Sequence, residues 1–132
     1  MLFLGEPEFG LVEGGEALRR RPHDPEMRGA YQQPAWCLLL LDRVQPAIEM
    51  FNNALAGRPR QWINRFALAA ALGLKGDLDG ARAELGESLK LEPEMNSLAR
   101  FRANRPWGNA QYWALFEKTA AAGVRRVGFP DK

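Results

Sequence analysis

The hydrophobic and small residues in the middle of the chain repeat at a fixed distance. A set of positions recurs 34 residues later, in the same order and with nearly the same sizes: Ala47, Phe51, Ala54, Leu55 and Pro59 correspond to Ala81, Leu85, Ser88, Leu89 and Pro93. A period of this length and content is typical of a helix-turn-helix unit. Because such a unit cannot bury its apolar face alone, it stacks on its neighbours. The pattern therefore predicts an array of antiparallel helix pairs.

Turn signals between the repeating segments set the bounds of the predicted helices. Gly76 suits the left-handed position that ends a helix, and Asp77 can cap the next helix with its carboxylate. We expect no strand, and helices near residues 7–21, 25–41, 44–56, 60–74, 78–91, 96–104 and 109–122. Pro34 either kinks the second of these helices or marks its true start, because a proline inside a helix costs about 3 kcal/mol.

The amino-terminal end of the array is incomplete. Residues 5–22 match only the second helix of a repeat, and Gly10, Gly14 and Gly15 weaken that helix. Gly10 and Gly14 lie one turn apart, which would let another helix approach closely. We therefore expect a homodimer through the amino-terminal helix, with Gly10 and Gly14 at the contact.

The carboxyl-terminal end of the chain does not continue the repeat. After Pro93 the period stops, and large apolar residues crowd the segment 98–116. An apolar stripe at helical spacing runs through Tyr112, Leu115 and Phe116. Such a helix must lie against something, so residues 94–132 are predicted to form a helical cap on the array.

The repeating frame resembles that of the tetratricopeptide repeat family. Its apolar and small positions, its Gly-Asp turn and its closing proline are met by Leu68, Ala69, Gly76, Asp77, Ala81, Leu85, Ser88, Leu89 and Pro93. The preceding repeat departs from the frame, with Pro34 in place of a leucine and Asp42 in place of a glycine. The resemblance covers about two and a half repeats within residues 5–93. It implies an all-α fold, namely a short right-handed α-solenoid of antiparallel helix pairs in one domain spanning 1–132, and a non-enzymatic role as a protein-binding scaffold.

The tail has a narrower resemblance, to the carboxyl ends of bacterial class III nucleotide cyclases that carry C-terminal tetratricopeptide repeats. It rests on residues 91–100, 105–109, 112–113 and 128–130. In that family the repeats follow a catalytic domain, whose paired metal-binding aspartates and purine-selecting residues have no counterpart here. The resemblance implies an alternative in which the chain is the severed regulatory segment of a cyclase-like signalling protein.

By resemblance to tetratricopeptide repeats, the first helices of the pairs line a concave groove. The residues expected to face it, and so to bind a protein partner, are Gln32, Trp36, Leu39, Ile63, Phe66 and Ala70. Family members that hold acidic C-terminal peptides of chaperones use lysine and asparagine there, so we do not expect that function. An apolar groove favours an apolar occupant, and the helix near 109–122 could fold back into it or cap it. The alternative is that these positions are ordinary core between helices.

Composition bears on the compartment of the protein. The chain has 132 residues, of which 46% are hydrophobic and 26% charged, as is ordinary for a globular domain. The apolar run at 35–41 is far shorter than the roughly 20 residues of a membrane span, and residues 1–4 lack the charged start of a signal peptide. We therefore expect a cytoplasmic protein with no membrane partner.

The residues that usually carry chemistry are scarce. His23 and Cys37 are the single histidine and the single cysteine, too few for a zinc cluster, and no acid/base constellation stands out. Cys37 lies within an apolar run, which favours a small buried hydrophobe over a reactive thiol. We therefore expect neither an enzyme nor a metal or other cofactor.

The basic, aromatic stretch near residue 100 has residue types that can bind a nucleic acid. Arginines could bind phosphate and aromatic rings could stack on bases at Arg100, Phe101, Arg102, Arg105 and Trp107. The net charge of +2 is small, and the pattern favours buried aromatic rings with solvated or ion-paired arginines. The sequence therefore favours a protein partner, of unknown identity, over a nucleic acid.

Overall fold

The computed structural model describes residues 32–105 and 109–132, and this part of the chain is all-helical, without a strand. The elements in chain order are α2 (Gln32–Leu40), α3 (Val44–Gly57), α4 (Trp62–Lys75), α5 (Leu78–Leu91), α6 (Leu98–Ala103), α7 (Ala110–Phe116), a π-helical turn η3 (Glu117–Ala121) and α8 (Ala122–Arg125). The last three follow one another without a break and form one long helical rod. The all-α prediction is therefore confirmed.

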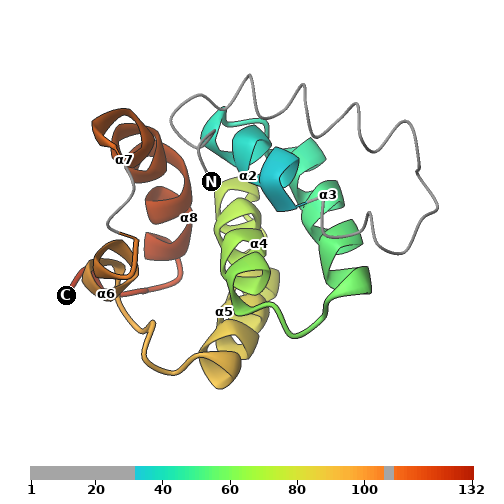
Figure 1. The fold of residues 1–132 in the computed structure, drawn as a ribbon. Helices are drawn as coiled ribbons and strands as arrows, with labels where there is room; N and C mark the ends of the chain where they lie inside the picture. The colour runs from blue at the N-terminus through green and yellow to red at the C-terminus, as the bar shows by residue number, and fades with distance from the viewer. Residues whose placement is uncertain (1–31, 106–108) are drawn as a thin grey trace.

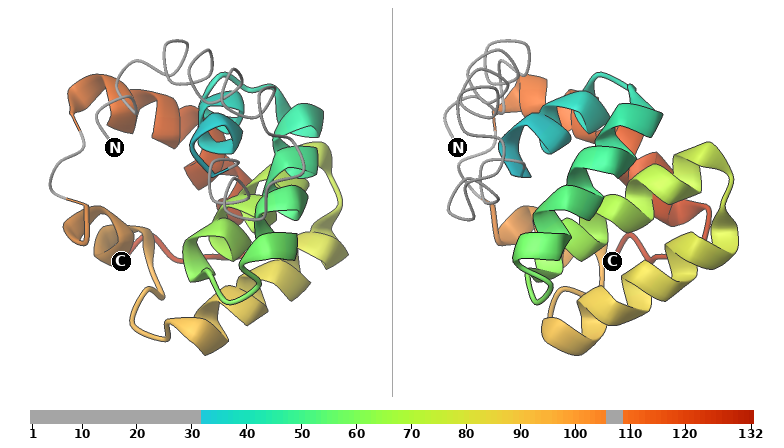
Figure 2. Two further views of the ribbon diagram at one scale, coloured as in Figure 1. Left: turned by 45° about the vertical axis from the view of Figure 1, so that its right-hand side comes forward. Right: turned by 90° about the vertical axis from the view of Figure 1, so that its right-hand side faces the viewer.

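Helix α4 lies at the centre of the fold. It packs against α3 and α5, and also against α8 and η3, while α2 packs against α3 and η3 (Figures 1 and 2). Residues 67–71 of α4 are all buried, as expected for a helix with neighbours all round. The two helices α2 and α4 thus lie between α3 and α5 on one side and the carboxyl-terminal elements on the other.

The predicted helix bounds hold best where the repeat is clearest. The helix predicted at 78–91 has those bounds in α5, and α3 is one residue longer than its prediction of 44–56. The helix expected at 60–74 begins and ends slightly later in α4, and the one at 96–104 is shorter in α6. The last predicted helix continues past 122 to Arg125 through the π-helical turn. Pro34 lies in the first turn of α2, and the helix predicted at 7–21 lies outside the described residues.

The turns that close α2 and α4 have the same hydrogen bonds. After α2, the N–H of Arg43 donates to the Leu38 carbonyl at 2.8 Å, and that of Asp42 donates to Leu39 at 3.0 Å. After α4, the N–H of Asp77 donates to the Leu72 carbonyl at 2.9 Å, and that of Gly76 donates to Gly73 at 3.2 Å. This pair of bonds is the Schellman motif, which satisfies the last carbonyls of a helix.

The carboxyl-terminal ends of α3 and α5 also match. Arg58 and Glu92 have nearly the same backbone conformation, with φ of −139° and −141° and ψ of 75° and 81°. The N–H of Arg58 donates to Ala54, and that of Glu92 donates to Ser88, both at 2.9 Å. The period seen in the sequence is therefore also a period of the backbone.

Polar side chains start the later helices. An oxygen of Asp77 accepts a hydrogen bond from the Gly80 N–H, Ser97 accepts from Arg100, and Asn109 accepts from Tyr112. Each bond satisfies an amide that the first turn of a helix leaves without a partner. Asp77 acts in this way as the sequence predicts.

Candidate functional site

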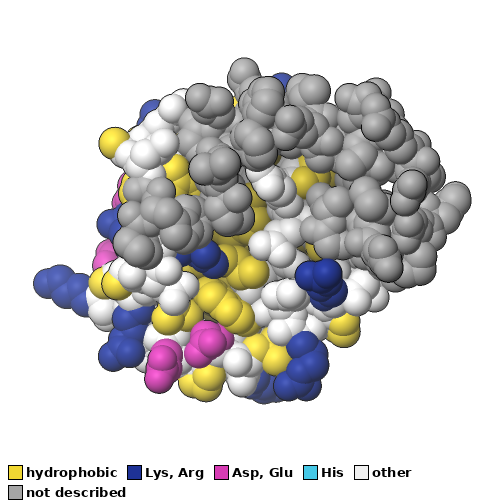
Figure 3. Space-filling view, viewed as in Figure 1, with side chains coloured by type: hydrophobic (Ala, Val, Ile, Leu, Met, Phe, Trp, Pro, Cys, Tyr) yellow, Lys and Arg dark blue, Asp and Glu magenta, His cyan; other side chains and the backbone are white. Residues whose placement is uncertain are grey.

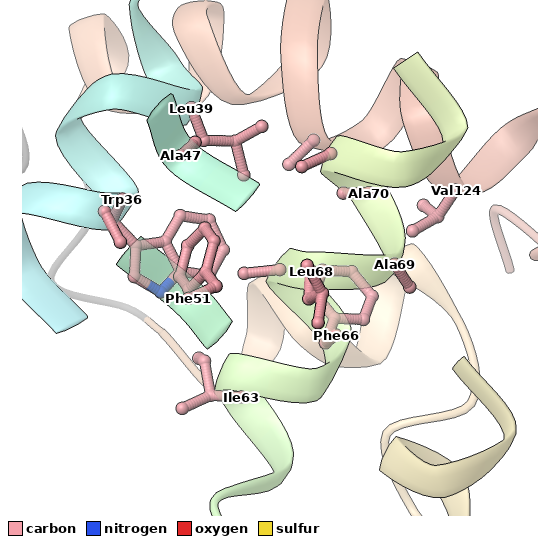
Figure 4. Close-up of a cluster of buried hydrophobic side chains, with 14 of the residues drawn as sticks. Trp36, Leu39, Ala47, Phe51, Ile63, Phe66, Leu68, Ala69, Ala70 and Val124 are labelled. Carbon is pink, nitrogen blue, oxygen red and sulfur yellow. The ribbon is translucent and has the colours of Figure 1, made fainter. Parts of the chain in front are cut away.

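The candidate groove residues lie on α2 and α4, on a surface that we call the α2/α4 face. Gln32 is half-buried, and the other five are buried and belong to one hydrophobic cluster, namely Trp36, Leu39, Ile63, Phe66 and Ala70. Figure 4 shows Trp36 beside Phe51 of α3 and, further along α4, Val124 of α8 beside Ala69 and Ala70. The face is therefore covered by other parts of the chain.

The cover comes from residues 97–105 and 109–132, which we call the C-terminal body. The ring of Phe101 in α6 stacks on that of Phe66 with centroids 4.6 Å apart, and it stacks on Phe116 of α7 at 5.1 Å on its other side. Phe129 meets the edge of Phe66 at 5.6 Å. These rings join α4 to three segments of the body, so the chain supplies an apolar occupant of its own face.

Two glycines let α4 and α8 touch backbone to backbone. A Cβ atom added to Gly73 would overlap the carbonyl oxygen of Gly123 and lie 2.8 Å from its carbonyl carbon. A Cβ added to Gly123 would overlap the Ala70 carbonyl in the same way. Carbon atoms in contact normally lie about 3.5–4.0 Å apart. The crossing of these helices therefore excludes any residue larger than glycine at positions 73 and 123.

The π-helical turn keeps both halves of the rod against the core. Tyr112 and Phe116 are buried before the turn, and Ala120 and Val124 are buried within and after it. The hydroxyl of Thr119 donates to the Leu115 carbonyl at 2.8 Å, as expected where a turn loosens the regular helix ladder. The aromatic half and the glycine half of the rod thus face α2 and α4 together.

An arginine beyond α8 caps the end of α4. Nη1 of Arg126 donates to the carbonyls of Gly73 at 2.9 Å and Leu74 at 3.1 Å. These carbonyls lie in the last turn of α4, where a helix has unpaired acceptors and a partial negative charge. The contact places a charged group of the C-terminal body beside the glycine crossing.

Ion pairs hold the C-terminal body together. Glu117 in η3 pairs with Arg102 of α6 and with Arg125 of α8, and Nε of Arg125 donates to Asp131 at 2.8 Å. The hydrogen bond from Arg125 is the main cause that holds the pKa of Glu117 below its usual value. Helix α5 does not take part in these pairs. Its Glu84 pairs with Arg65 of α4, with Nη1 and Oε2 3.0 Å apart.

The basic, aromatic stretch near residue 100 is divided between core and surface. Phe101 is 0% exposed, so its ring cannot stack on a nucleic-acid base. The guanidinium of Arg105 lies 4.8 Å from the centre of that ring and 5.7 Å from that of Trp62, and burial lowers its pKa. Burial raises the pKa of the neighbouring Tyr112 to about 12, an effect that Arg105 opposes. Trp107 lies outside the described residues.

The remaining candidate positions supply neither a reactive thiol nor a metal site among the described residues. Cys37 is fully buried, and burial raises the pKa of its thiol to about 11, so the thiol stays protonated. Within residues 32–105 and 109–132, no three or more His, Cys, Asp or Glu side chains gather where a metal ion could be held. Gly10, Gly14 and His23 lie outside the described part of the chain.

Sequence reasoning missed Gly73, Gly123 and Arg126. The signal at Gly123 is a glycine inside an alanine-rich helix, which is costly in isolation and so points to a close contact. Arg126 carries no such signal, because its partner carbonyls lie more than fifty positions earlier in the chain.

Comparisons with known proteins do not add to this picture: no protein-family model, no curated protein and no solved structure matches the chain significantly. No helix in the described segments combines the length and apolar composition required to cross a membrane. Inference about function therefore starts from the α2/α4 face and its occupant.

Proposed function

We propose that the chain is a cytoplasmic protein-interaction module of the tetratricopeptide repeat type, a short right-handed solenoid whose α2/α4 face receives a helical segment. The observation that carries the proposal is that this face already holds a helix, α8, in backbone contact at Gly73 and Gly123. A face that packs so closely on a helix has the shape and the apolar character of a helix-binding groove.

The repeated backbone geometry supports the tetratricopeptide assignment. Equivalent hydrogen bonds close α2 and α4, and equivalent conformations end α3 and α5, at the 34-residue spacing of the sequence. The hydroxyl of Ser88, at one of the repeating small positions, donates to the Trp62 carbonyl at 3.0 Å and joins the two helices of its pair. A period in both sequence and backbone is the property that defines a helical repeat.

The surface available for a partner includes more than the covered face. Figure 3 shows hydrophobic side chains gathered across the middle of the view of Figure 1, with Lys and Arg side chains near its lower and left edges. Trp62 and Leu89 are half-buried hydrophobic residues packed against the main cluster. In this proposal the chain binds rather than catalyses, and its buried Cys37 is a small hydrophobic residue of the core.

Site-specific crosslinking tests the proposal. A photoreactive amino acid replaces Trp62 at the edge of the face, and the same amino acid replaces the exposed Glu49 of α3 as a control. We expect the Trp62 variant to capture a protein from cell extract, and a synthetic peptide of residues 109–132 to compete with that capture. The same peptide carrying Gly123→Leu should fail to compete. Capture that is equal at Glu49, or that ignores the peptide, would count against the α2/α4 face as the binding surface.

The severed regulatory segment is a second proposal, and the resemblance of the tail favours it. Part of that resemblance, residues 128–130, includes Phe129, which is 5% exposed and packs on α4. An adjacent reading frame that encodes a nucleotide cyclase domain, and co-purification of its product with this chain, would support this version. A chain that co-purifies with other proteins but not with that product would contradict it.

A further inference from the structure

The turn between α3 and α4 forms a cleft bordered by two arginines. The cleft has a volume of about 450 Å³ and is lined by Arg58, Pro59, Arg60 and Gln61, and we call it the Arg58/Arg60 cleft. Both arginines are exposed, and neither takes part in an ion pair within residues 32–105 and 109–132. Two guanidinium groups at this cleft are therefore available to an anion from outside the described chain.

Hydrogen bonds fix the backbone of this turn. Nε and Nη2 of Arg65 donate to the Pro59 carbonyl at 3.3 and 3.2 Å, and the N–H of Gln61 donates to the Arg58 carbonyl at 3.3 Å. Nη1 of Arg65 pairs with Glu84 of α5 at 3.0 Å, so this acidic group already has a cationic partner. Because the turn is held in place before a ligand binds, less conformational entropy is lost on binding.

The repeat places an acidic turn 34 residues later. Arg58 and Arg60 correspond to Glu92 and Glu94, and a proline stands between the two charged residues in both turns. Arg58 and Glu92 have nearly the same backbone angles, and in each turn the N–H three residues later donates to the carbonyl of this residue, at 3.3 and 3.2 Å. Both turns lie at the lower end of the view in Figure 1. Because glutamates adopt the same turn, its shape does not require the arginines.

We propose that the Arg58/Arg60 cleft binds a phosphoryl group on a side chain of a partner protein. This inference rests on the proposed function in taking the partner to be a protein, and it adds a contact at a turn to the contact on the α2/α4 face. Guanidinium groups bind phosphate oxygens through paired N–H donors. A phosphorylated side chain carries a charge of about −1.5 to −2 at pH 7, so one such group balances both arginines, whereas one carboxylate balances only one of them.

The size and lining of the cleft favour a phosphorylated side chain over a free ion. Its volume of about 450 Å³ is much larger than a bare phosphate, and lies within the range of roughly 300–1,000 Å³ that is typical of small-molecule sites. The remaining space can hold the chain segment that carries the group. Gln61 supplies a neutral amide donor and Pro59 an apolar ring to such a segment. Arginine clusters of this kind recognise phosphorylated segments in other proteins.

An NMR titration tests the proposal. The probe is a synthetic peptide of glycine and alanine with one central phosphoserine, added to the isotope-labelled full chain. We expect the amide signals of Arg58, Arg60 and Gln61 to shift and those of residues 92–95 to stay, because the equivalent turn has the opposite charge. The same peptide with serine should cause no shift. With glutamate in place of phosphoserine it should bind about tenfold more weakly, because its charge is smaller.

Charge reversal at the turn identifies the groups that bind. Arg58→Glu combined with Arg60→Glu gives this turn the charges that residues 92 and 94 already carry on the same backbone, so the variant should fold normally. We expect it to bind the phosphopeptide about tenfold or more weakly, because it loses two charge-assisted contacts. Arg43→Glu combined with Arg100→Glu is the matched control. It changes the net charge equally at two other exposed arginines and should leave binding unchanged.

Several outcomes would overturn the proposal. Equal shifts with the serine peptide, or unchanged binding by the Arg58→Glu/Arg60→Glu variant, exclude the cleft as a phosphoryl site. A glutamate peptide that binds as tightly as the phosphopeptide excludes selection for phosphate, and inorganic phosphate that binds as tightly excludes a protein as the source of the group. Crosslinking at Trp62 is a separate measurement: if it captures a partner while the titration shows no binding, this inference fails and the proposed function stands.

Discussion

Asp42 and Gly76 occupy equivalent places in two turns 34 residues apart, and both have a left-handed backbone, with φ of 61° and 97°. Among the described residues, Asp42 is the one non-glycine residue with a positive φ. Glycine adopts this conformation freely, whereas a residue with a Cβ pays roughly 1 kcal/mol, and aspartate is among the residues that tolerate it best. The left-handed conformation therefore lowers stability in the turn that contains Asp42 but not in the turn that contains Gly76.

Exchanging these residue types should change stability in opposite directions. We expect Asp42→Gly to raise the free energy of unfolding by about 0.5–1 kcal/mol, because it removes the left-handed strain. Gly76→Asp should lower the free energy of unfolding by about 1 kcal/mol for the converse reason. Urea denaturation followed by circular dichroism measures both. Negligible effects of both substitutions would show that left-handed backbone strain does not distinguish the stability of the two turns.

Phe101 should be among the most costly residues to remove. It is fully buried between the rings of Phe66 and Phe116, so Phe101→Ala leaves a cavity and should lower the free energy of unfolding by about 3–5 kcal/mol. Phe101→Leu should cost less, because it keeps most of the volume. Arg100→Ala on the same short helix is the control and should change little, since Arg100 is exposed. Thermal denaturation distinguishes the three variants.

Acid should loosen the C-terminal body through Glu117. Its folded pKa is lowered, chiefly by the hydrogen bond from Arg125, so its contribution to stability is complete above the unfolded pKa of about 4.3. That contribution is lost as the pH falls through the lower folded pKa. Tryptophan fluorescence should therefore report a destabilisation below about pH 4.3 that is smaller in Glu117→Gln. A pH profile identical in the two proteins would exclude this carboxylate as the cause.

The Cys37 thiol should be protected in the folded protein. Burial raises its pKa to about 11, whereas a thiol in an unfolded chain has a pKa of about 8.5. The stability that this difference contributes is complete below about pH 8.5 and is lost as the pH rises towards the folded value. Labelling with a thiol reagent at pH 8 should be slow in the native protein and fast in denaturant. Fast native labelling would place the thiol at the surface, contrary to its burial.

The helices from α3 to α5 could be predicted from the sequence because their signals are local. The repeat from Ala47 to Pro93 combines helical periodicity, small residues and turn residues within each unit, and these features alone set the bounds of α3 and α5 closely. Even Asp42, which departs from the glycine usual at its position, keeps the backbone that the repeat requires. Local propensity and packing agree in this region.

The contacts of the C-terminal body could not be predicted in the same way. The partners Gly73 and Gly123 are far apart in sequence, and neither residue shows by itself which backbone it must approach. The π-helical turn at Glu117–Ala121 arises because two halves of one rod must both pack on the core, and a regular helical pattern does not reveal it. The candidate groove residues were placed on a shared face, but the position of their occupant depends on the tertiary structure.

Arg58 and Glu92 end their helices with the same backbone angles and the same hydrogen bond. A copy of residues 59–92 spliced in after Arg58 would therefore find at each junction the conformation that it already has at its own ends. The chain could in this sense gain a helix pair by duplication of these residues without any new turn or cap.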